Sequence, residues 1–288
     1  MSVMSKLERA GKRALAETAM SLLGRRTLAR LGRFLSNEAR LDTLNEITEN
    51  GEAAVQRAVL IGTAPTVELV IVDVGANVGD WTGQVLSAAD QLRPSNLRVF
   101  ALEPAGRTFG LLKRRLGQES RVTLVNKGAS DAEGTATLHV PPDRAAGTSS
   151  LHGESVGGPT SETVALTTID SFCAGHGLDH LHLVKIDTEG HDLLVLRGAT
   201  RMLSQRAIEV IQFEYNHRWV YARQFLRDAF ELLQPLGYQL GKVTSQGIER
   251  YGAWHPELET FREGNYLAYL PSWEARLPTI AWWNEGAP

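Results

Sequence analysis

The stretch that most constrains this chain runs from Leu69 to Trp81 and reads Leu-Val-Ile-Val-Asp-Val-Gly-Ala-Asn-Val-Gly-Asp-Trp. It begins as an apolar run interrupted only by Asp73, which predicts a strand covered on both faces of a sheet. Gly75 and Gly79 then bracket a tight turn, and a helical pattern begins beside the second glycine. A strand that enters a helix through a glycine-rich loop is typical of proteins that bind nucleotide-type cofactors. The alternative interpretation is a connection that binds no ligand.

Two side chains of this segment indicate which cofactor it suits. Asn77 stands where the dinucleotide fingerprint G-x-G-x-x-G has its second glycine, and asparagine tolerates the positive φ that such a turn requires. Asp73, two residues before the first glycine, would repel the pyrophosphate of a dinucleotide and attract an ammonium group. S-adenosylmethionine carries an amino group and a sulfonium but no phosphate. The segment therefore favours this cofactor over a nicotinamide dinucleotide.

From residue 67 onward, segments with strand character alternate with segments of helical character. The expected core strands are residues 69–74, 98–103, 122–128, 181–187 and 208–215, with further β segments at 135–140 and 163–167 and a final antiparallel pair at 238–243 and 266–270. The expected helices cover residues 78–89, 107–116, 168–176, 191–203 and 223–236. This alternation predicts an α/β fold with a doubly wound, mostly parallel sheet covered by helices on both faces.

Residues 1–60 have a helical pattern of leucines, and their first 35 positions carry an excess of positive charge. The basic side chains there are Lys6, Arg9, Lys12, Arg13, Arg25, Arg26, Arg30 and Arg33. A basic amphipathic helix can lie on an anionic membrane surface, bind a partner or mediate self-association. A helical arm packed on the main domain is the plainer alternative. We divide the chain into a basic helical arm, residues 1–62, and a main domain, residues 63–288.

Composition argues against several classes of protein. Hydrophobic residues make up 43% of the chain and charged residues 22%, which is typical of a globular domain. The single cysteine, Cys173, excludes a disulfide framework and a cysteine-rich zinc site, and it suits a reducing compartment. Neither a membrane span nor a secretory signal is evident, so we expect a cytoplasmic protein. The net charge of −3 and the lack of a basic stripe outside the arm argue against a nucleic-acid partner.

Each expected core strand ends near an acid or a short polar group. Because the carboxyl ends of parallel strands form the edge at which such sheets bind ligands, these side chains are expected to gather at one site. Glu103 suits the two hydroxyls of a ribose, and Ser130 and Asp131 are placed to contact an adenine edge. A helix-terminal charge and an ordinary turn are their structural alternatives. The predicted cofactor-binding residues are Asp73, Gly75, Asn77, Gly79, Glu103, Pro104, Ser130, Asp131 and Asp187.

Six short motifs stand out within residues 67–270. They are Asp73-Val-Gly-Ala-Asn-Val-Gly79, Leu102-Glu-Pro104, Leu166-Thr-Thr-Ile-Asp170, Lys185-Ile-Asp-Thr-Glu-Gly-His-Asp192, Leu196-Arg-Gly-Ala199 and Ile211-Gln-Phe-Glu-Tyr215. Together they resemble the FkbM-type methyltransferase family, with Asp192 standing where many relatives carry glutamate. The resemblance implies a class I, Rossmann-like methyltransferase fold with a seven-stranded sheet. It also implies S-adenosylmethionine as the methyl donor and O-methylation of a sugar or polyketide hydroxyl.

Such a methyl transfer is an in-line attack of a hydroxyl oxygen on the sulfonium methyl, and alignment of the two groups supplies much of the rate. The alcohol proton requires either a desolvated acid or histidine as a late base, or a divalent ion that lowers the alcohol pKa. Asp187, Glu189 and Glu214 are hard oxygen donors that suit Mg²⁺, but their spacing leaves metal dependence open. Structural roles are the alternative for each candidate. The predicted catalytic residues are Asp187, Glu189, His191, Glu214 and His217.

The C-terminal part of the chain offers a hint about the methyl acceptor. Five of the six tryptophans lie after residue 217, where their rings either pack against sugar rings or belong to an ordinary core. Residues 254–259 are expected to form a substrate-side loop, and residues 143–161 a mobile lid. We expect an O-methyltransferase that acts on a hydroxyl of a sugar, a glycan or a glycosylated natural product. The alternatives are a polyketide hydroxyl as acceptor, and a methyltransferase-like binding module docked through the N-terminal arm.

Overall fold

The computed structural model describes residues 3–42, 47, 49–64, 66–92, 96–140, 149–152 and 160–285. The chain divides into two compact units, Met1–Thr43 and Leu44–Pro288. This division comes earlier than the predicted boundary at residue 62, because the last helix of the expected arm belongs to the second unit. Each unit is described by itself.

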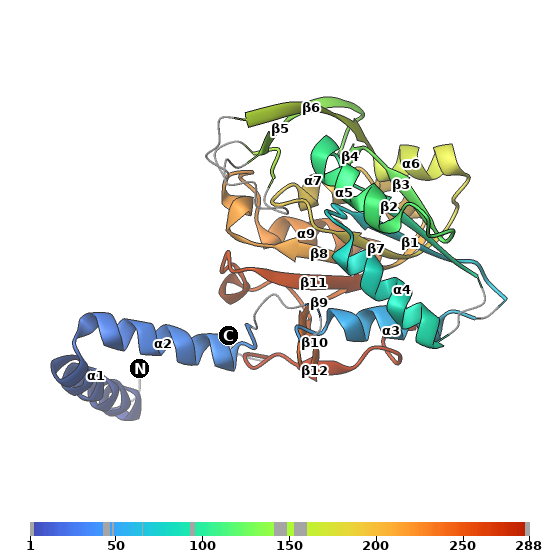
Figure 1. The fold of residues 1–288 in the computed structure, drawn as a ribbon. Helices are drawn as coiled ribbons and strands as arrows, with labels where there is room; N and C mark the ends of the chain where they lie inside the picture. The colour runs from blue at the N-terminus through green and yellow to red at the C-terminus, as the bar shows by residue number, and fades with distance from the viewer. Residues whose placement is uncertain are drawn as a thin grey trace. The chain divides into compact units, whose positions relative to one another are not determined.

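The first unit consists of α1 (Val3–Leu23) and α2 (Arg25–Ala39), which contact each other (Figure 1). Gly24 separates them with a φ of 76°, in the left-handed region that favours glycine. Several large apolar side chains of this unit are exposed, namely Leu15, Met20, Leu22, Leu23, Leu31, Phe34 and Leu35. None of the helices in the described part of the chain is long and apolar enough to cross a membrane. Contact of the arm with a membrane or with another copy of the chain stays a prediction.

The second unit is built on a nine-stranded sheet with the order β12-β10-β9-β11-β8-β7-β1-β2-β3. Its strands are β1 (Leu69–Val74), β2 (Leu97–Leu102), β3 (Val122–Val125), β7 (Leu181–Ile186), β8 (Ile208–Tyr215), β9 (Gln239–Thr244), β10 (Gly247–Tyr251), β11 (Gly264–Tyr269) and β12 (Thr279–Ala281). The five neighbouring strands β3, β2, β1, β7 and β8 are parallel to one another. Strand β11 is antiparallel to both of its neighbours, β8 and β9. The mostly parallel sheet and the antiparallel pair are therefore confirmed.

Two strands extend this sheet beyond the seven that the family resemblance implies. β10 forms a hairpin with β9, and β12 pairs with β10 in parallel. The sequence pattern does not predict them, because β10 carries two adjacent charged residues, Glu249 and Arg250, and β12 is only three residues long. The overall α/β class is unchanged by this extension of the sheet edge.

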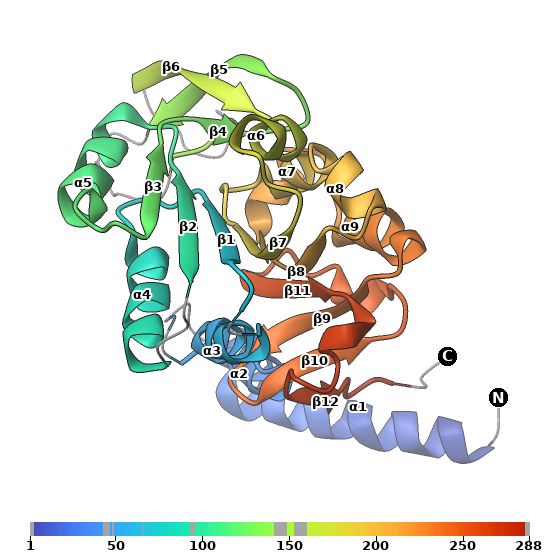
Figure 2. The ribbon, with the colours of Figure 1, turned by 90° about the vertical axis from the view of Figure 1, so that its right-hand side faces the viewer.

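Helices cover both faces of the sheet, as Figure 2 shows. On one face lie α3 (Glu52–Gly62), α4 (Asp80–Leu92) and α5 (Gly106–Leu116), and on the other α6 (Ile169–His176), α7 (Asp192–Arg197), α8 (Thr200–Ser204) and α9 (Leu226–Leu233). Alternate residues of β1 point to opposite faces of the sheet. Ile71 therefore packs in the core beneath α3, α4 and α5, and Val72 packs in the core beneath α6 to α9. A strand buried on both faces explains the continuous apolar run in the sequence.

A small second sheet has the order β4-β6-β5. Its strands are β4 (Gly128–Ala129), β5 (Gly134–Val140) and β6 (Thr160–Thr167), and they confirm the two additional β segments. Most of the expected lid, residues 143–161, lies outside the described residues. Within it, Ser150 forms an antiparallel bridge with His139 of β5, with N···O distances of 2.9 and 3.0 Å. Residues 149–152 are therefore held against the small sheet.

Helix α3 is fixed to the sheet by a buried carboxylate. Glu52 is 3% exposed and accepts hydrogen bonds from the side-chain amides of Asn50, Gln212 and Asn265. Gln212 lies on β8 and Asn265 on β11, so one carboxylate connects the helix to two strands. Apolar side chains of α3 also pack in the same core as those of α4. These contacts explain why α3 belongs to the second unit.

We expect Glu52→Ala to lower the free energy of unfolding of the second unit by about 2–4 kcal/mol, because buried amide donors lose their acceptor. Urea unfolding of the full chain, followed by tryptophan fluorescence, measures this unit because all six tryptophans lie after residue 80. Glu68→Ala, which removes an exposed carboxylate beside β1, is the matched control and should change the value by less than about 0.5 kcal/mol. Equal stability of the two variants would contradict the anchoring role of Glu52.

Candidate functional site

The loop after β1 has the backbone that its sequence predicts. Gly75, Asn77 and Gly79 have φ values of 81°, 51° and 88°, all in the left-handed region. A Cβ on Gly75 would lie 1.8 Å from the carbonyl oxygen of Asp187, so this position requires glycine. The amides of Gly75 and Ala76 both donate to the carbonyl of Leu102, at 2.9 Å. The loop is thus folded onto the ends of β2 and β7.

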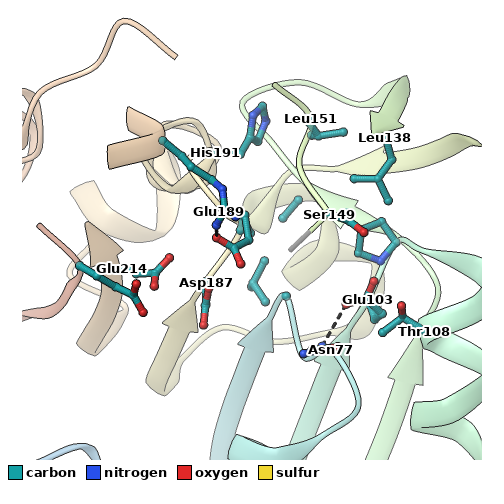
Figure 3. A pocket seen from close by; sticks show the side chains of 18 of the residues that line it. Asn77, Glu103, Thr108, Leu138, Ser149, Leu151, Asp187, Glu189, His191 and Glu214 are labelled. Atoms are coloured by element: carbon teal, nitrogen blue, oxygen red, sulfur yellow. Dashed lines mark hydrogen bonds and ion pairs between the residues drawn. The ribbon is translucent and has the colours of Figure 1, made fainter. Parts of the chain in front are cut away.

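A pocket of about 430 Å³ lies at the carboxyl ends of β1, β2, β7 and β8 (Figure 3). The predicted residues that line it are Gly75, Asn77, Glu103, Pro104, Asp187, Glu189, His191, Glu214 and His217. Four other predicted residues do not line it, namely Asp73, Gly79, Ser130 and Asp131. Strand ends separated by more than a hundred residues therefore meet at one site, and the roles of the individual side chains stay predictions.

Glu103 marks one end of the pocket. Its Oε1 accepts the amide of Ala105 at 2.8 Å and its Oε2 accepts the amide of Asn77 at 3.0 Å. Burial raises the pKa of Glu103 to about 7, against the lowering effect of these two hydrogen bonds. Ala105 is the N-terminal cap of α5, so the carboxylate contacts that helix end and also faces the pocket.

Asp73 lies behind the pocket and not on its surface. Its side chain is fully buried, its Oδ2 accepts the hydroxyl of Thr82 at 2.6 Å, and its Oδ1 lies 3.8 Å from Lys185 Nζ. Lys185 Nζ also lies 3.0 Å from Asp187 Oδ2. Burial alone would lower the pKa of Lys185, but Asp187 and Asp73 raise it above its ordinary value. A charged lysine therefore connects Asp73 to the pocket through Asp187.

Three acids gather at the other end of the pocket. Oxygen atoms of Asp187, Glu189 and Glu214 all lie within 4.8 Å of one another. Lys185 pairs with Asp187, and Arg218 pairs with Glu189. Burial raises the pKa of Glu214 well above its ordinary value, and the neighbouring Asp187 adds to this effect. The donor set suits a hard divalent cation. However, two of its carboxylates already have cationic partners, and the pKa of the third is raised.

A second buried acid holds the loop that carries these side chains. Asp192 accepts the amide of Thr188 on Oδ1 and the amide of Gly190 on Oδ2, each at 3.2 Å. Between them, Glu189 has a φ of 55°, which is uncommon for a residue with a side chain. Burial raises the pKa of Asp192 to about 7. Asp192 therefore orders the loop that aims Glu189 into the pocket.

Several pocket residues lie outside the sequence prediction. They are Thr108, Leu138, Ser149, Leu151, Arg218 and Glu263, among others. Arg218 follows His217 directly, just after the end of β8. The prediction takes the polar residues that follow each strand, and it would include Arg218 if it reached one residue further along the chain. Leu138 comes from β5, and no local pattern links it to the site. Ser149 and Leu151 lie within residues 143–161, the segment expected to act as a lid, but neither is among the predicted site residues.

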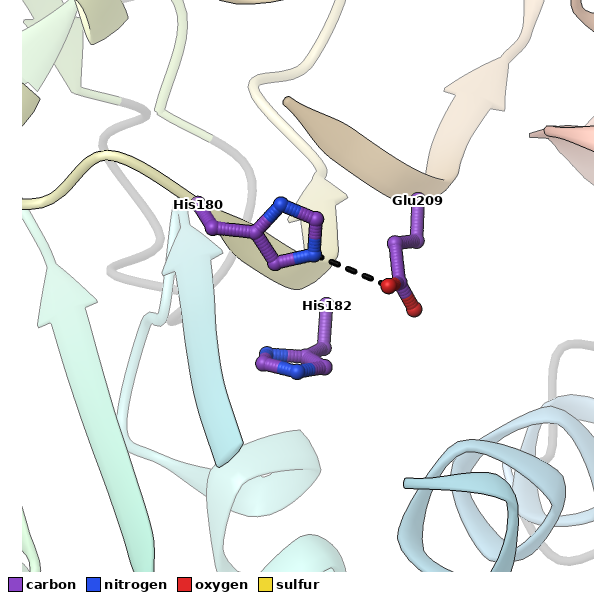
Figure 4. Close-up of side chains that lie close together, drawn as sticks. All are labelled: His180, His182 and Glu209. Carbon is purple, nitrogen blue, oxygen red and sulfur yellow. Dashed lines mark hydrogen bonds and ion pairs between the residues drawn. The ribbon is translucent and has the colours of Figure 1, made fainter. Parts of the chain in front are cut away.

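Another group of polar side chains lies at the amino ends of β7 and β8 (Figure 4). His180 Nε2 lies 2.9 Å from Glu209 Oε1, and the indole of Trp273 donates to Glu209 Oε2 at 2.8 Å. The amide of Val70 donates to Nδ1 of His182 at 3.1 Å, so the neutral ring carries its proton on Nε2. A metal-bound histidine needs a donor proton on its second nitrogen, which this amide opposes. The group therefore fits a structural hydrogen-bond cluster.

The family model of the FkbM methyltransferase domain matches residues 73–240. Among solved structures, the chain is similar to the FkbM methyltransferase of Methylobacillus flagellatus KT, with 18% identity, a TM-score of 0.44, and coverage of 74% of this chain and 48% of that one. It is also similar to precorrin-6y C5,15-methyltransferase of Geobacter metallireducens GS-15, with 16% identity, a TM-score of 0.38, and coverage of 75% and 86%. The chain thus spans about half the length of the first of these relatives. A comparison with curated protein sequences found no match.

The matched region covers more than half of the chain. It begins at Asp73, and it includes Glu103, the loop from Asp187 to Asp192 and the end of β8. These residues stand on the nine-stranded sheet and its flanking helices. The chain therefore belongs to the FkbM methyltransferase family.

Proposed function

We propose that the protein transfers the methyl group of S-adenosylmethionine to a hydroxyl of a sugar, a glycan or a glycosylated natural product. Membership of a methyltransferase family implies this methyl donor. The observation that carries the proposal is a pocket with two chemically different ends. Glu103 and Asn77 lie at one end, and Asp187, Glu214 and their neighbours lie at the other (Figure 3).

The first end suits the adenosine part of the donor. Each carboxylate oxygen of Glu103 accepts one backbone amide and retains a second lone pair. Two adjacent hydroxyls of a ribose are a matching pair of donors for these lone pairs. Asn77, whose amide donates to Glu103, and Gly75 also line the pocket. We therefore assign Glu103, Gly75 and Asn77 to the donor.

The second end suits an acceptor with several hydroxyl groups. Asp187, Glu189 and Glu214 present acceptor oxygens, and His217 adds a ring nitrogen. Of the five C-terminal tryptophans, Trp219 and Trp273 are almost completely buried in the core, so they do not serve as stacking platforms. Support for a sugar acceptor therefore comes from the acidic end of the pocket and not from these two rings.

The affinity for S-adenosylhomocysteine should rise with pH around the pKa of Glu103. This pKa is about 7 in the protein alone, and ribose hydroxyls bind the ionised carboxylate, so binding lowers the pKa and is favoured at higher pH. Calorimetric titration should show a dissociation constant about tenfold lower at pH 8 than at pH 6. Glu103→Gln should bind more weakly and lose this dependence. A wild-type affinity that does not change with pH would contradict the assignment.

The methyl transfer itself is tested with labelled S-adenosylmethionine and a panel of sugar and glycoside acceptors. We expect O–CH₃ product by NMR, and a rate about 100-fold lower in Asp187→Asn, because the acceptor loses a charged partner. Asp179→Asn removes an exposed acid and should leave the rate unchanged. Label on nitrogen or carbon, or donor binding without transfer to any hydroxyl, would overturn the proposed function.

Chelation of divalent ions should leave this activity within about twofold of its original value. Lys185 and Arg218 already balance Asp187 and Glu189, so the protein itself supplies the positive charge that a metal would bring. Assays with a chelator, and after addition of Mg²⁺, measure this directly. Loss of activity on chelation and its recovery with Mg²⁺ would instead identify the three acids as a metal site.

A further inference from the structure

A row of hydrogen bonds leads from the pocket to the protein surface. His191 lines the pocket, and its Nε2 lies 2.9 Å from the hydroxyl of Ser130. Ser130 is 4% exposed and donates to Oδ1 of Asp131 at 3.0 Å, and Asp131 is exposed to solvent. On the other side of the ring, His191 Nδ1 lies 3.4 Å from Nε2 of His152. Neither Ser130 nor Asp131 lines the pocket.

The direction of each hydrogen bond follows from the acid at the end of the row. An ionised carboxylate only accepts, so the Ser130 hydroxyl donates to Asp131. The hydroxyl oxygen must then accept from His191, which places the ring proton on Nε2. The lone pair of the neutral ring is consequently on Nδ1. His152 lies 3.4 Å from this nitrogen, and the proposed step requires an acceptor hydroxyl in its place.

The surroundings of His191 keep the ring neutral. Burial and the neighbouring His152 together lower its pKa to about 4, against the raising effect of Asp131. Burial also lowers the pKa of His152. A proton that arrives at Nδ1 is therefore not retained as a stable imidazolium, and release of the Nε2 proton toward Ser130 restores a neutral ring.

We propose that His191, Ser130 and Asp131 form a proton relay that carries the acceptor proton out of the pocket during methyl transfer. This inference rests on the proposed function. As the bond between the methyl carbon and the acceptor oxygen forms, the carbon–sulfur bond breaks and its electron pair stays on sulfur. The acceptor proton moves to His191 Nδ1, the Nε2 proton to Ser130 Oγ, and the hydroxyl proton to Asp131 Oδ1. Asp131 releases its proton to water, and the starting tautomer returns by exchange with solvent after product release.

The relay gives these residues a role different from the adenine contact that their sequence position suggests. In an adenine contact, Ser130 and Asp131 would contribute to donor affinity. In the relay, they act on the acceptor through His191 and are positioning residues, so donor affinity does not depend on them. His191, which lines the pocket, is the one member that the relay places against the acceptor.

The decisive variant is Asp131→Asn, which retains an oxygen that accepts the Ser130 hydrogen bond but cannot take up the proton. We expect kcat to fall by about tenfold or more, with KM for the acceptor and affinity for S-adenosylhomocysteine unchanged. The remaining rate should rise with pH more steeply than in the wild type. Glu133→Gln removes an exposed acid two residues away and should behave as wild type. An unchanged kcat and pH profile in Asp131→Asn, or a loss of donor affinity, would overturn the relay.

A second measurement does not require turnover. Nitrogen-15 NMR of the histidine rings should show His191 as the Nε2–H tautomer in the wild type, and a mixture of tautomers in Ser130→Ala. The Nδ1–H tautomer in the wild type would overturn the relay even if methyl transfer occurs. If the expected tautomer is found and no hydroxyl acceptor is methylated, the relay geometry stands and the proposed function fails. The two inferences can thus fail separately.

Discussion

A buried lysine holds together the edge of the sheet on which the pocket lies. Lys185 Nζ lies 3.0 Å from Asp187 and 3.8 Å from Asp73, and the lysine side chain is only 7% exposed. Burial of a charge is tolerated only beside opposite charge, so the ends of β1 and β7 must keep their acids near this cation. Without it, the two carboxylates would repel each other across neighbouring strands. The placement of Asp187 in the pocket therefore depends on a residue that does not itself line the pocket.

The loops that follow β1 and β7 pack closely against each other. The backbone at Gly75 passes the carbonyl of Asp187 without room for a Cβ, and Asp192 binds the amides on both sides of Glu189. Glu189 adopts a left-handed backbone at some cost, which these surrounding hydrogen bonds offset. The loops after the adjacent parallel strands β1 and β7 are thus fixed to each other. A ligand in the pocket meets side chains whose positions are set before it binds, which favours both affinity and alignment.

Sequence reasoning succeeds where local patterns and topology suffice. An apolar run predicts a buried strand, and parallel topology brings strand ends together, so Glu103, Asp187 and Glu214 are found in one pocket. It does not reveal partners that depend on register or on long-range packing. Asp73 faces Lys185 because β1 and β7 align these two residues, and no property of the loop itself indicates it. The contact of Ser130 with His191 likewise depends on how the small sheet meets the large one. The same limit explains α3, whose attachment depends on amides from two distant strands.

The charges around the pocket are consistent with the proposed chemistry. Three carboxylates, Asp73, Asp187 and Glu189, lie beside two cations, Lys185 and Arg218, so acids outnumber bases in this cluster. A sulfonium donor carries one positive charge on its reacting group, and methyl transfer moves this charge toward the acceptor oxygen. A fixed negative charge beside the acceptor favours that movement without reorganisation of solvent. It also attracts the charged donor more strongly than the neutral thioether product, so the same electrostatics that assist the transfer favour exchange of product for donor.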